Sequence, residues 1–156
     1  NSVYIGGGTG IADGIILKSE LIDFNKRNDV KRSWELEMPS EETIESCLSP
    51  KGMIHQYNLS QKEKVETLDQ LSKNKNADII FEKAVKAFSF LIQNRTQFFK
   101  ANHAKIEKIV IGQRLGIFMA NSKLISLLES NTDIPFDYSI DRRTAALGAA
   151  WKRICS

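Results

Sequence analysis

A glycine-rich turn between two apolar segments is the part of this sequence best suited to chemistry. Five of the fifteen residues from Val3 to Leu17 are glycine, and Thr9 adds a hydroxyl group among them. Glycine permits positive φ angles and a close approach of a ligand to the main chain. Successive backbone N–H groups in such a turn can form a concave site for phosphate oxygens. The turn at Gly8, Thr9 and Gly10 is therefore a candidate phosphate site, and the alternative is a tight hairpin that binds nothing.

Two common phosphate loops do not fit this turn. A P-loop ends in Gly-Lys-Ser/Thr and leads into a helix, whereas Gly10 is followed by Ile-Ala-Asp. A dinucleotide-binding G-x-G-x-x-G that starts at Gly8 needs glycine at position 13, where this chain has Asp13. It also needs a helix directly after the loop, but Ile15 to Leu17 predict a strand. The pattern that remains is strand, glycine turn and antiparallel strand.

The composition predicts one globular domain of 156 residues. The formal net charge is only +3, and the basic residues are scattered, which argues against nucleic-acid binding through this domain. No apolar run is long enough to span a membrane, and no signal peptide is visible. We therefore expect a cytoplasmic protein. Its two cysteines, Cys47 and Cys155, are expected to be reduced thiols rather than a disulfide.

Hydrophobic periodicity places the remaining elements. Strands are expected at 3–6, 11–18, 20–24, 106–111 and 134–138. Helices are expected from a Ser40 cap to Leu48, after a capping box at 60–63, and at 77–101, 115–129 and 144–154, with a turn at 51–54. The phenylalanines of the long helix are expected in the core rather than around a ligand. This order predicts an α/β domain with a mixed sheet that begins with a β-hairpin and is covered by helices.

Three short motifs occur along the chain, and their order matters for the comparison that follows. They read GTGIADGII at residues 8–16, EKIVIG at 107–112 and RTAALGAAW at 143–151. Together they resemble the second phosphate loop, the adenosine-binding element and the C-terminal helix of sugar kinases of the ROK and bacterial glucokinase type. That family belongs to the actin-like, ribonuclease-H-like ATPase superfamily. The resemblance implies a ribonuclease-H-like fold, with Gly8, Thr9 and Gly10 at the β- and γ-phosphates and Gly112 and Gln113 beside the adenosine.

The resemblance also assigns two acidic residues. Glu35 and Glu45 match the carboxylates that contact sugar hydroxyls in the family. Carboxylates suit this role because each can accept two hydrogen bonds from hydroxyl groups. The alternative for both residues is a solvated surface acid. Met38 stands where the family has a histidine, and Gln113 stands where a second glycine is usual. Asp13 also replaces a glycine; it could approach the metal ion, or its charge could weaken phosphate binding.

The resemblance places this chain in the C-terminal half of a two-domain kinase that phosphorylates a hexose or amino sugar with ATP and Mg²⁺. Residues 25–76 would be an insertion-like segment on the substrate side. The catalytic aspartate and first phosphate loop of the family would lie in an N-terminal domain, so no catalytic residue is expected here, and the chain alone would be inactive. The cysteine-rich zinc loop of the family has no counterpart, so no zinc is expected.

The implied partners are the nucleotide, the sugar, the N-terminal domain and, in a homodimer, a second copy. A second hypothesis is a non-catalytic regulator or degenerate kinase of the ROK type that binds a sugar or nucleotide without transferring phosphate.

Overall fold

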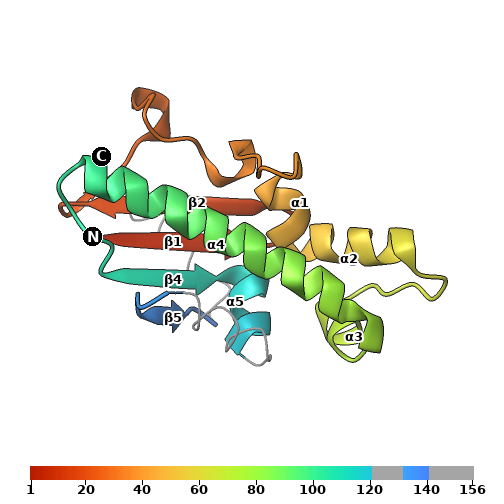
Figure 1. Ribbon diagram of the computed structural model, residues 1–156. Coiled ribbons are helices and arrows are strands. Elements are labelled where there is room, and N and C mark those ends of the chain that lie inside the picture. Colours follow the sequence, from red (N-terminus) through yellow and green to blue (C-terminus); the bar gives the residue numbers. More distant parts are fainter. Residues whose placement is uncertain (121–131, 141–156) are drawn as a thin grey trace.

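The centre of the structure is a five-stranded mixed sheet with the strand order β3-β2-β1-β4-β5. The computed structural model describes residues 1–120 and 132–140 (Figure 1). β1 (Ser2–Gly7) and β2 (Ile11–Leu17) form the predicted antiparallel hairpin, and β3 (Glu20–Leu21) extends it. β4 (Lys108–Gly112) lies parallel to β1, and β5 (Phe136–Tyr138) lies parallel to β4. The α/β class and the mixed sheet predicted from the sequence are confirmed.

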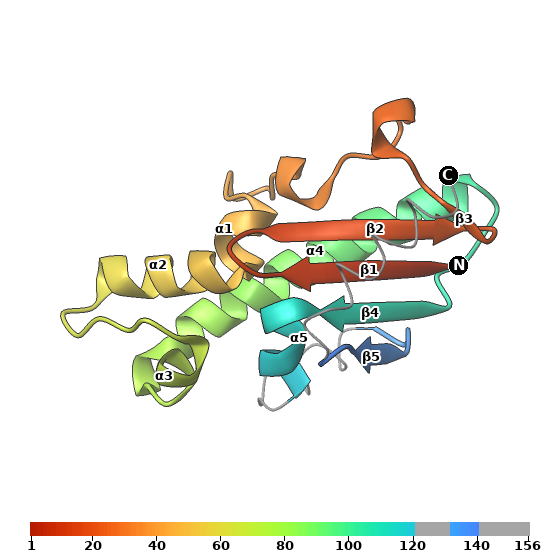
Figure 2. The same cartoon turned by 180° about the vertical axis from the view of Figure 1, so that it is seen from behind.

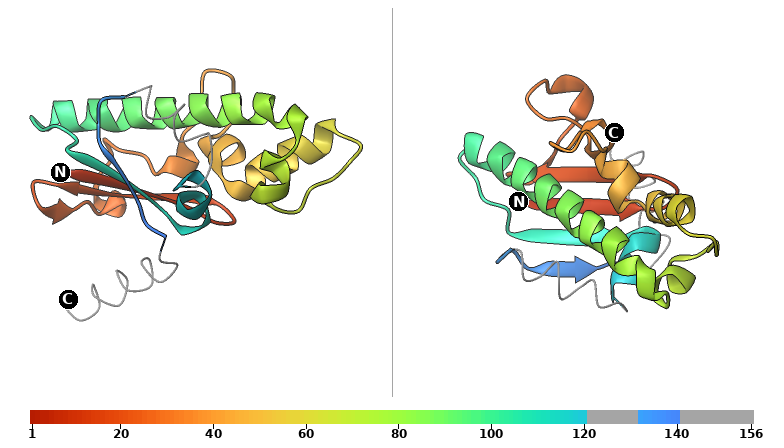
Figure 3. Two further views of the ribbon diagram at one scale, coloured as in Figure 1. Left: turned by 90° about the horizontal axis from the view of Figure 1, so that it is seen from below. Right: turned by 45° about the vertical axis from the view of Figure 1, so that its right-hand side comes forward.

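The long helix α4 (Asp78–Ala101) covers one face of this sheet (Figure 3). Seen from the other side, the strands lie in front of it (Figure 2). Its inner stripe packs on the strands, as the contact between the Phe88 and Phe136 rings at 5.6 Å shows. Each fully buried aliphatic side chain in this layer stabilises the fold by about 1.5–3 kcal/mol. The predicted boundaries of the helix are correct to one residue, and three of its five phenylalanines are buried: Phe88, Phe98 and Phe99.

Short helices gather at the end of the sheet where β1 and β4 finish (Figure 1). α5 (Gln113–Ala120) follows β4 without a loop. α1 (Ile44–Leu48) and α2 (Pro50–Ser60) pack against each other, and α3 (Leu68–Ser72) packs on α2. The short segments η1 (Phe24–Lys26), η2 (Ser33–Glu35) and η3 (Lys75–Ala77) are 3₁₀ helices. In the described part of the chain, no helix is long and apolar enough to cross a lipid bilayer.

The predicted start of the first helix is wrong. Ser40 does not cap it; the helix begins at Ile44, and the Thr43 hydroxyl accepts a hydrogen bond of 3.1 Å from the Ser46 N–H. The preceding residues form a tight turn, in which the Met38 N–H donates to the Glu42 carbonyl at 2.9 Å. Glu41 has a φ of 65° there, which a helical residue cannot adopt.

Other helix boundaries also differ from the sequence pattern. Residues 51–54 are not a turn, because Pro50 starts α2 and the Ser49 hydroxyl caps it. Ser60 is the last residue of α2 rather than a cap, and the capping box belongs to Thr67 and Gln70 of α3. The predicted helix at 115–129 begins at Gln113; its part beyond residue 120 and the predicted helix at 144–154 lie outside the described residues.

Candidate functional site

The turn between β1 and β2 presents unpaired hydrogen-bond donors at the C-terminal end of β1. The Gly8 N–H donates to the Gly10 carbonyl at 2.9 Å and closes the turn. Among the described residues, the Thr9 and Gly10 N–H groups and the Thr9 hydroxyl have no hydrogen-bond partner. Thr9 is exposed at the tip. Three donors close together on an accessible turn can bind the oxygens of an anion.

The glycines of the turn serve close packing rather than an unusual backbone conformation. Positive φ angles were expected here, but no described glycine has one. A Cβ on Gly7 would lie 2.6 Å from the Leu115 Cβ, and a Cβ on Gly10 would lie 2.5 Å from Glu45 Oε2. The Leu115 Cβ is fixed to its backbone, so glycine is required at position 7 by the close approach of α5 to the turn. At position 10 the neighbour is the end of the flexible Glu45 side chain, which can move aside.

Glu45 lies against the side of the turn that faces α1. Its Oε2 accepts a hydrogen bond of 3.1 Å from the Ile11 N–H, and the residue is half-buried. The sequence left open whether Glu45 is a surface acid or a ligand for sugar hydroxyls. The structure places its carboxylate on the turn itself, at the point where β2 begins. A group bound by the turn would therefore lie close to this negative charge.

Glu35 lies in a different setting, on η2. It is exposed, and its carboxylate accepts hydrogen bonds from the Arg32 N–H at 2.7 Å and the Arg32 guanidinium at 3.2 Å. The hydrogen bond from the Arg32 backbone is the main reason that the pKa of Glu35 lies below its ordinary value. In the part of the chain that the structure describes, its polar contacts are therefore local, and none of them reaches the turn or Glu45.

Gln113 directly follows β4 in the sequence and lies beside the turn in space. It has a φ of 60°, a left-handed conformation that glycine adopts most easily, and it pairs with Gly7 across the sheet. Its side-chain amide lies 3.2 Å from the positions that a Cβ on Gly6 or Gly8 would occupy. The preceding Gly112 packs against the Tyr4 ring, where a Cβ would lie 2.3 Å from the phenol oxygen.

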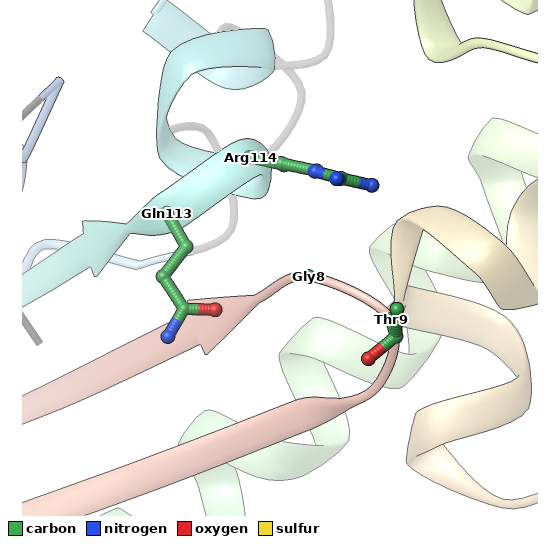
Figure 4. Close-up of a pocket in the computed structure, with 4 residues that line it drawn as sticks. All are labelled: Gly8, Thr9, Gln113 and Arg114. Atoms are coloured by element: carbon green, nitrogen blue, oxygen red, sulfur yellow. The ribbon is translucent and has the colours of Figure 1, made fainter. Parts of the chain in front are cut away.

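A pocket of about 320 Å³ opens between the turn and the start of α5 (Figure 4). Its lining residues are Gly8, Thr9, Gln113 and Arg114. Three of these were proposed from the sequence for phosphate or adenosine, and the structure brings them together. Arg114 was missed. Its position two residues after the end of β4 was the available signal, because ligands of open α/β sheets bind outside the carboxyl ends of the strands.

A buried ion pair joins β2 to α4, and it was not predicted from the sequence. The Asp13 Oδ2 accepts hydrogen bonds from Arg95 Nε at 2.8 Å and lies 2.7 Å from Arg95 Nη2, and both side chains are fully buried. Asp13 Oδ1 accepts from the Ser33 N–H at 2.8 Å, and Arg95 also donates to the Lys31 carbonyl at 2.8 Å. Burial lowers the pKa of Arg95, and the charge of Asp13 opposes that effect. The Asp13 carboxylate is thus bound by Arg95. The suggestion from the sequence that Asp13 could approach a metal ion is corrected by this buried ion pair.

The fold is that of known proteins, although the sequence matches no protein-family model and no curated protein. A ROK hexokinase from Thermus thermophilus superimposes with a TM-score of 0.69 at 15% identity, covering 98% of this chain and 57% of the hexokinase. A ROK family glucokinase from Streptomyces griseus, in complex with glucose and AMPPNP, gives 0.65 at 10% identity, covering 97% and 59%.

A ROK family transcriptional regulator, a homolog of the E. coli MLC protein, also shares this fold. It gives a TM-score of 0.51 at 14% identity, covering 84% of this chain and 35% of the regulator. The chain thus shares the fold of these ROK proteins and spans a little over half the length of the kinases.

Proposed function

We propose that this chain is the C-terminal domain of an ATP-dependent sugar kinase of the ROK type, acting on a hexose or an amino sugar. The carrying observation is the arrangement of the turn at residues 8–10. The turn carries unpaired N–H and hydroxyl donors, its residues Gly8 and Thr9 line a pocket, and the Glu45 carboxylate lies against Gly10 and Ile11. Donors suit a phosphate group and a carboxylate suits sugar hydroxyls, so one turn can hold both reacting groups side by side.

On the phosphate side, Gly8, Thr9 and Gly10 would bind the β- and γ-phosphates of ATP. The Thr9 and Gly10 N–H groups and the Thr9 hydroxyl need a partner, and phosphate oxygens accept from all three. Gly112 and Gln113 would border the adenosine, because Gln113 lines the pocket opposite the turn and Gly112 directly precedes it at the end of β4. Mg²⁺ bound to the nucleotide would neutralise charge on the phosphates.

On the sugar side, Glu45 is the better supported ligand. One carboxylate oxygen is held by the Ile11 N–H, which fixes the orientation of the group and leaves lone pairs for hydroxyl donors. Glu35 would join it only if its carboxylate exchanges a hydrogen bond from Arg32 for one from the sugar. Loss of Glu45 should therefore affect sugar binding more than loss of Glu35.

Phosphoryl transfer needs a base that accepts the proton of the attacking hydroxyl. We expect that base, an aspartate, in an N-terminal domain that closes over this one. The residues of this chain would then contribute positioning, which lowers the barrier by holding the hydroxyl and the γ-phosphate in line. The shared fold of ROK kinases supports this division. A cytoplasmic location and a homodimer are parts of the same proposal.

The test is a kinase assay on the longest natural polypeptide that contains this chain. ATP consumption is measured with Mg²⁺ and a panel of hexoses and amino sugars. We expect at least one sugar to be phosphorylated, with a raised KM for that sugar in Glu45→Gln and a smaller change in Glu35→Gln. Sugar binding without ATP consumption across the whole panel would instead favour the second candidate, a regulator. The fold shared with the ROK transcriptional regulator supports that candidate.

A further inference from the structure

One charged side chain at the pocket stands out because it lacks a counter-ion. Each of the other arginines in residues 1–120 is paired: Arg27 with Asp29, Arg32 with Glu35 and Arg95 with Asp13. Within the same range, Arg114 forms no ion pair and no hydrogen bond. It is exposed at the first turn of α5.

The direction of this side chain gives the exposed charge a place to act. Arg114 extends from the start of α5 over Gly8 toward Thr9, across the mouth of the pocket (Figure 4). Glu45 lies against the same turn through its hydrogen bond to the Ile11 N–H. The turn thus has a cation at its pocket and a carboxylate at the start of β2. An anion that binds the unpaired donors of the turn is attracted by Arg114 and repelled by Glu45.

We infer that Arg114 binds the phosphate chain of the substrate directly and is a determinant of its affinity. A guanidinium group donates two parallel hydrogen bonds to phosphate oxygens, which gives it more directional binding than an ammonium group. This inference rests on the proposed function, because it concerns the same pocket. It adds that the site discriminates by phosphate charge, so a triphosphate binds more tightly than a monophosphate.

The inference can be tested by NMR titration of the longest natural polypeptide that contains this chain, labelled with ¹⁵N. Inorganic triphosphate is the first probe, and ATP and AMP are the others, with the amide signals of Thr9 and Gly10 as the readout. Arg114→Gln should weaken triphosphate and ATP binding about tenfold to a hundredfold, the usual value of a charged hydrogen bond. Arg114→Lys should recover part of the affinity, and binding of AMP should change less than twofold.

Lys105→Gln is the matched control. It removes the same charge from an exposed side chain in the segment before β4, at the opposite end of the strands from the pocket. This variant should bind like the wild type. If wild-type Thr9 and Gly10 signals shift saturably but Arg114→Gln behaves like Lys105→Gln, the role of Arg114 is refuted and the phosphate site stands. If no wild-type signal of the turn responds to triphosphate or ATP, both proposals fail.

Discussion

The buried pair of Asp13 and Arg95 makes a sharp prediction about stability. The two groups lie 2.7 Å apart with no exposed surface on either side chain. Replacing one of them leaves a buried charge without its partner, which typically costs about 3–5 kcal/mol. Domains unfold with only about 5–15 kcal/mol. We therefore expect Asp13→Leu and Arg95→Met each to remove a large part of the stability of this domain.

The double variant should cost much less than the sum of the two single variants. An apolar pair of similar volume is often as stable as the ion pair that it replaces. The remaining loss comes from the Ser33 N–H, which is buried and donates to Asp13. An unsatisfied buried donor costs about 1–3 kcal/mol. The coupling energy of the pair should then be about 3 kcal/mol or more, compared with near zero for independent sites.

Urea unfolding followed by circular dichroism measures these free energies, provided that the m value is unchanged. The exposed pair of Lys108 and Asp137 is the control, since it has the same 2.7 Å distance but about half of each side chain is exposed. Its coupling, measured with Lys108→Met and Asp137→Leu, should be about 0–1 kcal/mol. Equal coupling energies for the two pairs, or additive losses at Asp13 and Arg95, would refute the reasoning from burial.

Three further predictions concern the turn and its neighbours. Gly7→Ala should lose about 1–3 kcal/mol through the overlap with Leu115, whereas Gly14→Ala, which meets nothing within 4 Å, should lose none; thermal unfolding distinguishes them. Gln113→Gly should be close to neutral, and Gln113→Val should lose about 1–2 kcal/mol, because Gln113 has a φ of 60°; equal losses would contradict the strain argument. Burial raises the pKa of Tyr4 above 10.0, so its stabilising effect is present below pH 10 and is lost as the pH rises through the folded pKa. Tyr4→Phe should thus show a smaller fall in unfolding free energy above pH 10, and an unchanged pH profile would contradict this.

The parts of the fold that the sequence predicted well are those set by local pattern. Alternation of apolar residues gives β1 and β2, and the stripe of α4 is long enough that no other period fits it. The helix caps are harder to predict, because several nearby residues can offer the same capping hydrogen bond. Ser40 is the better cap by type, but Glu41 has a φ of 65° in the turn that follows it, so the helix starts only after Thr43.

The candidate site was predictable in its glycine turn but not in its charges. The glycine turn lies directly between β1 and β2, so its position follows from the residues next to it in the sequence. Asp13 and Arg95 are 82 residues apart, and nothing local marks an arginine in a helical stripe as the partner of a strand aspartate. Arg114 was missed because its significance comes from the pocket that it faces, which forms only when β4 pairs with β1.

The most direct test of the central claim is a crystal structure of the longest natural polypeptide containing this chain, bound to AMPPNP and the sugar that it phosphorylates. We predict phosphate oxygens within hydrogen-bond distance of the Thr9 and Gly10 N–H groups, with Arg114 beside them. We also predict a sugar hydroxyl on Glu45, at the start of β2. A nucleotide whose phosphates lie away from the turn at residues 8–10 would contradict it.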